Sequence, residues 1–262
     1  MIPNIVHYVF GLQEQTEDFL FCYYLSVYSC SVINTPDRIL FHYHHEPKGK
    51  WWEETKKLPG FELHRIEIPR FLGPHVISRT AHKADVVRMR ALYEHGGVYL
   101  DMDTICVREW KHLLHHNTVL AKEKSYPGIQ DGICNAIMMT APRSPFFEEW
   151  IAHYPRFFAP QGWREASIIL PLLLAEEHPK SLTLHEPSVF FEPSWNETDK
   201  IFEESEESEE IPESLIALHL WESYSQKYLD TIHDWTWAEK NPNTLYGRIM
   251  KSIQKRLERS KN

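Results

Sequence analysis

Residues 84–103 read ADVVRMRALYEHGGVYLDMD, and this stretch carries the strongest indication of both fold and chemistry. Its apolar residues recur at intervals of three and four, which is typical of a helix that packs against a core. Gly96-Gly97 ends the helix and allows a sharp turn into the apolar strand Val98–Leu100. Asp101 and Asp103 follow directly, so the stretch predicts a helix, a turn and a strand that deliver two carboxylates to a cleft.

The two aspartates and the helix before them predict a metal-assisted diphosphate site. Residues two apart along a strand project to the same face, so Asp101 and Asp103 present their carboxylates together. Such hard oxygen ligands suit Mg²⁺ or Mn²⁺, which bridge substrate phosphates. Asp85 and Arg88 share one face of the helix, and a guanidinium can fork onto phosphate or sugar oxygens. Ligands of open α/β sheets bind just beyond the carboxyl ends of strands, where these aspartates are expected.

Patterns in the rest of the chain predict an α/β domain around a mostly parallel sheet, with helical additions. Strands are expected over 5–10, 38–45 and 62–68, and helices over 17–31, 80–95, 145–158 and 164–175, where Pro171 is a kink or boundary. We expect a single domain over 1–262. An acidic run predicts a mobile loop near 201–212, and a basic helix is expected near 244–260.

The basic C-terminal helix has two interpretations. Ile249, Met250, Ile253 and Leu257 follow helical spacing, and basic residues surround them. A helix of this kind can lie on an anionic membrane. Apolar stripes more often face a core, however, so we expect a docked helix and keep peripheral membrane contact as the alternative.

Composition limits the function classes. The 262 residues are 42% hydrophobic, and the formal net charge of -9 argues against nucleic-acid binding, which requires basic surfaces. Four cysteines without metal-ligand spacing are expected to be reduced thiols. No apolar run reaches the about 20 residues of a membrane span, and residues 1–7 lack the features of a signal peptide. These observations predict a cytoplasmic protein, or one peripheral to a membrane.

The string AHKADVVRMRALYEHGGVYLDMD, residues 81–103, resembles the DxD-containing sugar-binding region of glycosyltransferase family 32. This family includes yeast-type α-1,6-mannosyltransferases and α-1,4-galactosyl- and N-acetylglucosaminyltransferases, and it is distantly related to the clostridial glucosylating toxins. Three further blocks are similar to the family and lie in family order: Ile2–His7, Asn135–Met138 with Ala141–Pro145, and Ala217–Trp221. The resemblance implies a GT-A fold, a UDP- or GDP-sugar donor, Mn²⁺ or Mg²⁺, retention of anomeric configuration and a role in polysaccharide biosynthesis.

The resemblance also implies roles for the matching residues. Asp103 would ligate the metal directly, Asp101 would contact the metal through water or the donor ribose, and His219 would lie near the metal and diphosphate. The implied donor-binding residues are Asp85, Arg88, Asp101, Asp131, Asn135 and Trp221. The candidate catalytic residues are Asp101, Asp103 and Arg88. The chain departs from the family after His219, because Glu222-Ser223-Tyr224-Ser225 stands where a Ser-Trp often follows. The group that would order a loop over the leaving phosphate is therefore unassigned.

Two other groups of residues attract attention. The pair Trp51-Trp52 could form a platform for an acceptor, although packing is the commoner use of such residues. His42, His44 and His45 lie on an alternating strand that places His45 opposite the other two, and we interpret them as strand surface rather than a metal cluster.

Two other functions compete with glycosyl transfer. A sugar nucleotidyltransferase also uses paired aspartates and a metal, but such enzymes commonly begin with a Gly-rich phosphate loop, and Val9–Leu12 offers little of that. A non-catalytic glycan-binding module could keep the same fold. The presence of all four residues of the expected diphosphate site, Asp85, Arg88, Asp101 and Asp103, argues against such a module. We therefore expect a metal-dependent glycosyltransferase that acts on a glycan, a lipid-linked glycan or another hydroxyl acceptor.

Overall fold

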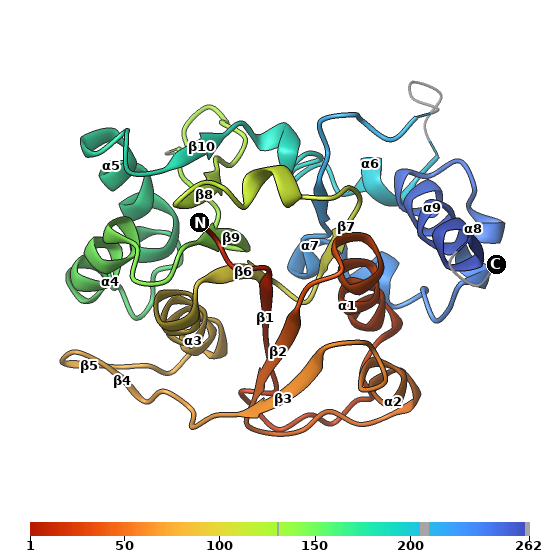
Figure 1. The fold of residues 1–262 in the computed structure, drawn as a ribbon, viewed down its shortest axis with the longest axis horizontal. Coiled ribbons are helices and arrows are strands. Elements are labelled where there is room, and N and C mark those ends of the chain that lie inside the picture. Colours follow the sequence, from red (N-terminus) through yellow and green to blue (C-terminus); the bar gives the residue numbers. More distant parts are fainter. Residues whose placement is uncertain (130, 205–209, 260–262) are drawn as a thin grey trace.

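A computed structural model describes residues 1–129, 131–204 and 210–259, which are built around a seven-stranded sheet (Figure 1). The strand order is β10-β8-β9-β6-β1-β2-β3. The strands are β1 (Ile5–Phe10), β2 (Arg38–Tyr43), β3 (Phe61–Arg65), β6 (Gly97–Leu100), β8 (Thr118–Ala121), β9 (Ile137–Thr140) and β10 (Thr183–His185). β9 pairs antiparallel with both of its neighbours, and every other pair in this sheet is parallel. The predicted mostly parallel α/β sheet is confirmed.

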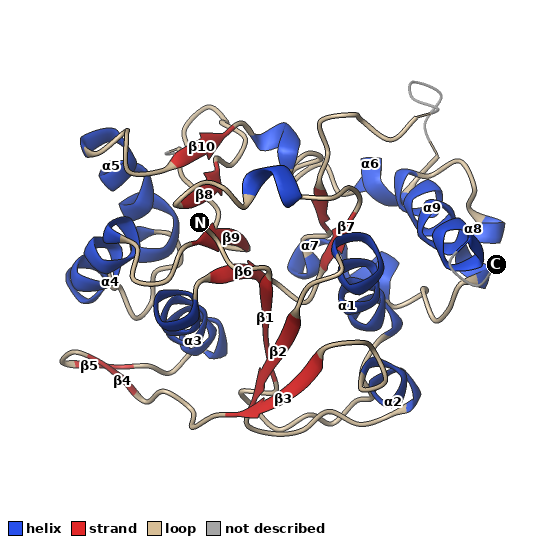
Figure 2. Cartoon of the chain, in the orientation of Figure 1, coloured by secondary structure: helices blue, strands red, loops and turns tan. Residues whose placement is uncertain are grey.

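Helices cover both faces of the sheet (Figure 2). Alternate residues of β1 show the two faces, because Val6 and Tyr8 belong to one apolar core and Val9 belongs to the other. The first core includes side chains of α1 (Phe21–Asn34) and α9 (Leu245–Arg259). The second core includes side chains of α3 (Thr80–His95), α4 (Pro145–Phe157) and α5 (Leu170–Glu177). The carboxyl ends of β1 and β6 are thereby held between two packed layers.

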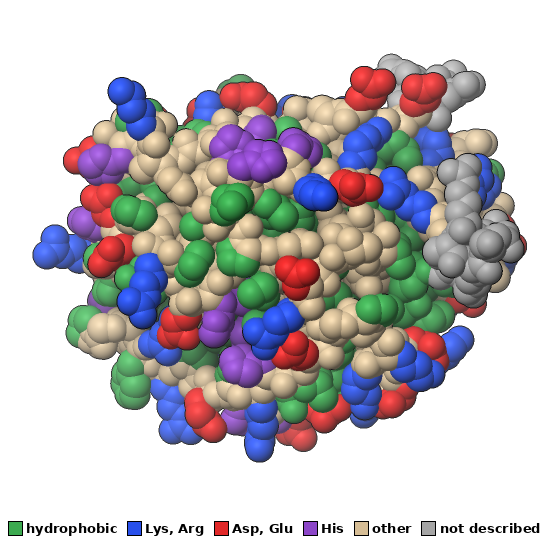
Figure 3. Space-filling model, viewed as in Figure 1, with side chains coloured by type: hydrophobic (Ala, Val, Ile, Leu, Met, Phe, Trp, Pro, Cys, Tyr) green, Lys and Arg blue, Asp and Glu red, His purple; other side chains and the backbone are tan. Residues whose placement is uncertain are grey.

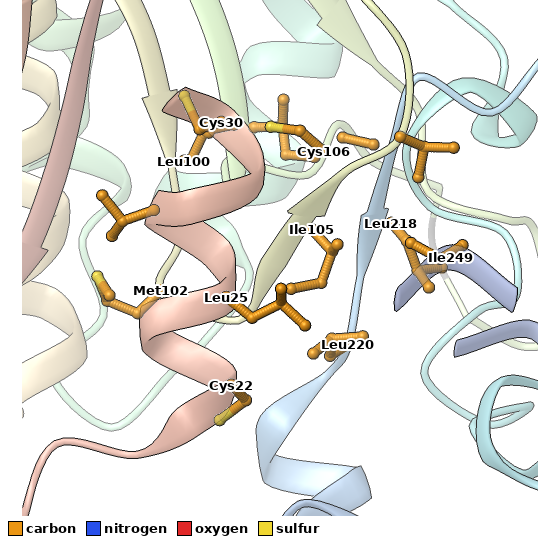
Figure 4. Close-up of a cluster of buried hydrophobic side chains, with 14 of the residues drawn as sticks. Cys22, Leu25, Cys30, Leu100, Met102, Ile105, Cys106, Leu218, Leu220 and Ile249 are labelled. Atoms are coloured by element: carbon orange, nitrogen blue, oxygen red, sulfur yellow. The ribbon is translucent and has the colours of Figure 1, made fainter. Parts of the chain in front are cut away.

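A small second sheet joins the C-terminal part of the chain to the strand that follows the aspartates. β7 (Thr104–Cys106) pairs antiparallel with β11 (Ala217–His219), and His219 is the register partner of Thr104. Figure 4 shows side chains of these two strands, among them Ile105 and Leu218, packed between α1 and α9. This pairing brings His219 next to Asp103 across more than a hundred residues of sequence.

The remaining elements are short. They are α2 (Lys50–Thr55), β4 (Phe71–Leu72), β5 (His75–Val76), α6 (Asp199–Phe202), α7 (Glu222–Leu229), α8 (Thr236–Lys240), a π-helical turn (Glu165–Ile169) and 3₁₀ turns at Lys111–Leu113 and Pro187–Val189. β4 and β5 form a hairpin beside α3 and α4 (Figure 1). α7 begins directly after β11 and its loop, and this start borders the candidate site.

Two predicted helices differ from the structure for identifiable reasons. The first begins at Phe21 rather than at residue 17, because the Phe19 N–H donates to the Lys48 carbonyl and holds the preceding segment against a distant loop. The helix expected over 164–175 is a π-helical turn followed by α5. Pro171 lies in the first turn of α5, where a missing N–H is tolerated, so it marks a boundary rather than a kink.

The interpretation of the 42–45 histidines as strand surface is wrong for His42, which is buried. Its Nε2 lies 3.0 Å from Nδ1 of His7 on β1, and its Nδ1 lies 2.8 Å from Nδ1 of His64 on β3. On the face drawn in Figure 3, histidine side chains gather beside α3 and β1. The three imidazoles connect neighbouring parallel strands through the sheet, which a period-two pattern could not reveal.

The C-terminal helix is docked by its apolar side. Ile249, Met250 and Ile253 are all buried against the first core, while the side chain of Leu257 lies outside the described residues. These three buried side chains are therefore not available to a membrane, and peripheral membrane contact through this helix stays a prediction. The centre of the acidic run, residues 205–209, lies outside the described residues, and α6 occupies the beginning of the expected loop.

All four cysteines are buried free thiols. Among the described residues, no helix has both the length and the apolar composition needed to cross a lipid bilayer.

Candidate active site

A cavity of about 460 Å³ lies where β1 and β6 end. Val9 and Phe10 at the end of β1 line it, together with residues from α3, from the 123–136 loop and from the start of α7. The predicted site residues that line this one cavity are Asp85, Arg88, Asp101, Asp103, Asn135, His219 and Trp221. The structure therefore brings together almost all of the residues that the sequence singled out.

Asp131 is the exception. Its side chain is exposed and does not line the cavity. The neighbouring Gly132 is buried against Ile168, so the backbone faces inward at this point and the aspartate points to solvent. The sequence places Asp131 close to Asn135, but the loop between them turns it away from the site.

Asp101, Asp103 and His219 form a candidate metal site. One ligand atom from each residue lies within 4.8 Å of the others, and within the described residues no other group of three or more acidic, histidine or cysteine side chains does so. Nε2 of His219 lies 3.2 Å from Oδ1 of Asp103. Two carboxylates and an imidazole that converge on an open cavity fit a divalent cation with coordination positions left for a substrate.

The backbone fixes Asp103 from the other side. The Glu222 N–H donates to Oδ2 of Asp103 at 2.8 Å, so the start of α7 is tied to the metal site. Trp221 precedes it in a left-handed conformation, with φ of 56°. A non-glycine residue in this region is strained, and such residues concentrate at functional sites. The turn places the Trp221 ring 4.2 Å from the His219 ring and sets the first amide of α7 on Asp103.

Asp101 and the buried Arg88 form a partly buried ion pair behind the metal site. Nη2 of Arg88 lies 3.1 Å from Oδ1 of Asp101, and Nη1 donates to the Asn135 carbonyl at 2.9 Å. The Tyr99 O–H donates to Asp101 at 2.6 Å, and the Tyr99 ring lies 4.4 Å beneath the guanidinium. Arg88 is 6% exposed. Both terminal nitrogens of the guanidinium are therefore already paired with protein oxygens. Arg88 acts on the site mainly by holding the Asp101 carboxylate in place.

Asp85 is held in the same network. It accepts hydrogen bonds from the Asn135 side-chain amide at 2.8 Å and from the Tyr154 O–H at 3.0 Å. Nε of Arg88 lies 3.6 Å from it. These protein partners hold the buried carboxylate in place, so Asp85 and Asn135 present a rigid polar wall to the cavity.

The pKa shifts follow the burial and the pairing of these groups. Burial raises the pKa of Asp101, aided by the Asp103 charge and opposed by Arg88. Burial also acts to raise the pKa of Asp103, but His219 and backbone N–H groups outweigh it and lower that pKa. For His219, burial is outweighed by Asp103, and the pKa is raised. The two aspartates are therefore unequal, and Asp103 is the stronger anion.

Several functional candidates were not evident from the sequence. Burial and the Asp103 charge raise the pKa of Glu222 to about 7, and the Tyr23 O–H donates to its carboxylate. Glu222 lines the cavity, as do the aromatic side chains of Trp163, Trp195 and Tyr224. The departure from the family pattern after His219 was the one signal that pointed to this segment.

The proposed aromatic pair Trp51-Trp52 lies elsewhere. Trp52 is fully buried, and its ring packs on Phe19 and Phe41. Trp51 packs on Tyr24, and neither tryptophan lines the cavity. The common use of such residues, packing, is the one found here.

Comparison with known proteins identifies the class. Residues 8–124 match the family described as "Glycosyltransferase sugar-binding region containing DXD motif". Glucan organizing enzyme 1 of Cryptococcus neoformans var. grubii is 32% identical over 245 residues, which cover 88% of this chain and 66% of that protein. Inositol phosphoceramide mannosyltransferase 3 of Schizosaccharomyces pombe is 37% identical over 112 residues, 41% of this chain and 28% of that protein. The crystal structure of the glycosyltransferase GlyE of Streptococcus pneumoniae TIGR4 is similar over 97% of this chain and 64% of that chain, with a TM-score of 0.53 and 15% identity.

The sheet order and this structural likeness define a GT-A fold, and the predicted fold class is confirmed. The match over residues 8–124 and the relative of 32% identity confirm the resemblance to family 32 and the expected enzyme class, a glycosyltransferase. The chain spans 66% and 28% of the lengths of the two curated relatives, so their names alone do not fix its substrates.

Proposed function

We propose that this protein transfers a sugar from a nucleoside-diphosphate sugar to a hydroxyl group of a glycan or lipid-linked glycan, with Mn²⁺ or Mg²⁺ as cofactor. The observation that supports this most strongly is the juxtaposition of two sites in one cavity. The ligand atoms of Asp101, Asp103 and His219 lie within 4.8 Å of one another. The rigid wall of Asp85 and Asn135 lines the same cavity.

The metal site and the polar wall would bind different parts of the donor. A divalent ion at Asp101, Asp103 and His219 would supply positive charge to the diphosphate leaving group. The imidazole in this set favours Mn²⁺ over Mg²⁺, because Mg²⁺ prefers oxygen ligands alone. The fixed oxygens and amide of Asp85 and Asn135 would hold hydroxyl groups of the donor sugar. Arg88 would offset negative charge from behind and keep Asp101 in place.

The donor and acceptor classes rest on chemistry and on the relatives. UDP- and GDP-sugars are the donors that the family resemblance implies. The names of the two relatives, a glucan organizing enzyme and an inositol phosphoceramide mannosyltransferase, support a glycan or glycolipid acceptor and a role in polysaccharide or glycolipid synthesis.

We infer transfer with retention of configuration. In this reaction the bond from the anomeric carbon to the phosphate oxygen breaks, and a bond from that carbon to the acceptor oxygen forms on the same face. The acceptor proton passes to the leaving phosphate, so no dedicated base is required. Proton NMR of the glycoside product, read at the anomeric signal of the transferred sugar, tests this step directly.

The metal site is tested by Asp103→Asn. We expect this variant to lose the Mn²⁺-dependent thermal shift given by UDP- and GDP-sugars and to lower donor hydrolysis by at least on the order of 100-fold, because the stronger of two anionic ligands is neutralised. Glu109→Gln, an exposed acidic residue that does not line the cavity, is the matched control and should leave both readouts unchanged.

The reaction products separate the competing functions. Release of a nucleoside diphosphate from the sugar donor supports glycosyl transfer, whereas release of pyrophosphate from a nucleoside triphosphate and a sugar 1-phosphate would identify a nucleotidyltransferase and overturn it. Mn²⁺-dependent hydrolysis that survives intact in Asp103→Asn would also contradict the proposal.

A further inference from the structure

A strip of aromatic rings lines one side of the cavity mouth. Trp195 and Tyr224 both line the cavity, and their ring centroids are 5.3 Å apart. Tyr126 packs on the other edge of Trp195 at 5.8 Å. The three rings come from three separate segments: the loop after β8, the turn before α6 and the first turn of α7. Side chains so far apart in sequence form one continuous apolar surface beside the candidate metal site.

This strip is held in place by hydrogen bonds. The Trp221 indole N–H donates to the Pro193 carbonyl at 2.9 Å, which ties the segment carrying Trp195 to the start of α7. Glu197 accepts from the Tyr126 O–H at 3.3 Å and from the Lys124 ammonium at 2.7 Å. The segments that carry the rings are therefore tied together by the protein itself, which lowers the entropic cost of binding.

Part of the strip is exposed to solvent, although side chains that serve only packing are usually buried. The Tyr224 side chain is 58% exposed although it contacts Trp195, so the tyrosine leaves a large part of its ring area toward solvent at the cavity mouth. A flat aromatic ring with polar groups around it suits a ligand that has one apolar face and hydroxyl groups at its edge. A pyranose ring presents this combination, because its axial C–H groups form an apolar face.

The donor does not account for this surface. Its diphosphate is assigned to the metal site and its sugar to the wall of Asp85 and Asn135. Its base is expected near Val9 and Phe10, because nucleotides in open α/β sheets bind beyond the carboxyl ends of the strands, and these residues line the cavity there. The strip joins the cavity on the side of α7 instead, next to the residues that follow His219.

Resting on the proposed glycosyl transfer, we propose that Trp195 and Tyr224 form a stacking subsite for a pyranose ring of the acceptor. The acceptor is then a glycoside whose sugar ring lies against Tyr224, with its reacting hydroxyl turned toward the metal site. Lys124 and Glu197 lie beside the strip and hold it by their ion pair. A linear polyol, which has no ring face, would not use this subsite.

Ligand-observed NMR titration tests the subsite without requiring turnover. The probes are methyl α- and β-glucopyranoside, mannopyranoside and galactopyranoside, each titrated into the full chain with Mn²⁺ and the nucleoside diphosphate that gives the larger thermal shift. We expect Tyr224→Ala and Trp195→Ala to raise the Kd of the pyranosides that bind by roughly tenfold, as loss of an aromatic stacking partner does. Tyr224→Phe keeps the ring and should bind as the parent protein does.

The controls separate the subsite from the donor site. Phe71→Ala removes a ring of similar exposure, 62%, that does not line the cavity, and it should change no Kd. Donor thermal shifts should be unchanged in Tyr224→Ala. The subsite is overturned if no pyranoside binds the parent protein, if glycerol binds as well as the pyranosides, or if Tyr224→Ala weakens donor binding instead. In each of these cases a retained Mn²⁺-dependent donor shift leaves the proposed function standing. If the parent protein shows no Mn²⁺-dependent thermal shift with any donor, both proposals are overturned.

Discussion

Arg88 lies in the predicted cavity, but its contacts differ from those that the sequence indicated. Its spacing from Asp85 and its proximity in sequence to Asp101 indicated a phosphate-binding fork. In the structure the guanidinium is buried between these two carboxylates and stacks on Tyr99. Burial opposes its charge, but Asp101, Tyr99 and Asp85 outweigh that effect and raise the pKa of Arg88. The residue holds the site together from behind.

We therefore expect Arg88→Met to destabilise the fold strongly. The substitution leaves the buried carboxylate of Asp85 and the partly buried carboxylate of Asp101 without their cation, and breaking a buried pair in this way costs about 3–5 kcal/mol. Arg38→Met is the matched control, because it breaks an ion pair with Glu62 whose side chains are about half exposed, at 47% and 45%. That loss should stay within about 1 kcal/mol. Urea denaturation measures both, and equal losses would contradict the structural role of Arg88.

Several site residues could be predicted from the sequence because their spacing is local. Asp101 and Asp103 are two apart in the short turn between β6 and β7, and Asp85 and Arg88 are three apart on one helix. Tyr154, which donates to Asp85 across 69 positions, and Glu222, which caps Asp103 across 119, have no local signature. Such partners depend on tertiary packing, and only a family pattern or a structure reveals them.

At the level of elements, the turn from α3 into β6 aims the aspartates. Gly96 has φ of 64° and Gly97 has φ of 109°, both in the region that favours glycine. A Cβ at Gly97 would overlap the Ile5 carbonyl on the adjacent strand, so this glycine also sets the distance between β6 and β1. The expected glycine turn is confirmed, and its second function is close approach of two backbones.

Gly97→Ala tests this double requirement. We expect it to lower the free energy of unfolding by more than about 3 kcal/mol, because an alanine there is both strained and in steric conflict. Gly128→Ala is the control, since its φ is also positive at 78° but a Cβ would meet nothing within 4 Å. That change should cost only about 1 kcal/mol, from conformation alone. Equal losses of stability in Gly97→Ala and Gly128→Ala, measured by thermal unfolding, would show that the close approach to Ile5 does not add to the cost of a side chain at position 97.

Elements were predicted well where capping and periodicity agree. α3 has the predicted bounds because two glycines end it and its apolar positions repeat regularly. α1 begins later than expected because its upstream apolar residues pack in a loop against residue 48. The hairpin of β4 and β5 went unpredicted, since two-residue strands carry too little pattern to be seen.

For the whole molecule, a chain of three imidazoles links the sheet to the turn before the aspartates. Nε2 of His7 lies 2.8 Å from the Gly96 carbonyl, which can only accept, so His7 is protonated at Nε2. Neutral His7 then accepts at Nδ1 from Nε2 of His42, and neutral His42 accepts at Nδ1 from Nδ1 of His64. The direction of every bond follows from that one carbonyl. A proton added to His7 or His42 would convert an acceptor into a donor that faces another donor.

The pKa values of the two inner histidines are lowered accordingly. Burial lowers the pKa of His7 to about 4, with the other nearby histidines adding to the effect and the bond to Gly96 opposing it. Burial lowers the pKa of His42 to about 2, again aided by its histidine neighbours. Above the ordinary histidine pKa of about 6.5, neither histidine makes the free energy of unfolding depend on pH. Below it the unfolded chain binds protons that the folded chain does not, so stability falls with decreasing pH.

We therefore expect the free energy of unfolding to fall on acidification from pH 6.5 to 5, by roughly 2 kcal/mol for each of the two histidines, before most carboxylates titrate. Urea denaturation across this range measures the slope. His42→Gln removes one proton-linked group and should make the slope shallower, whatever it does to stability at pH 7. His115→Gln, which changes an exposed histidine, should leave the slope as it is. An unchanged slope in His42→Gln would mean that protonation of the imidazole chain does not cause the loss of stability at low pH. A shallower one would identify the link between three strands and the glycine turn as the acid-sensitive part of the fold.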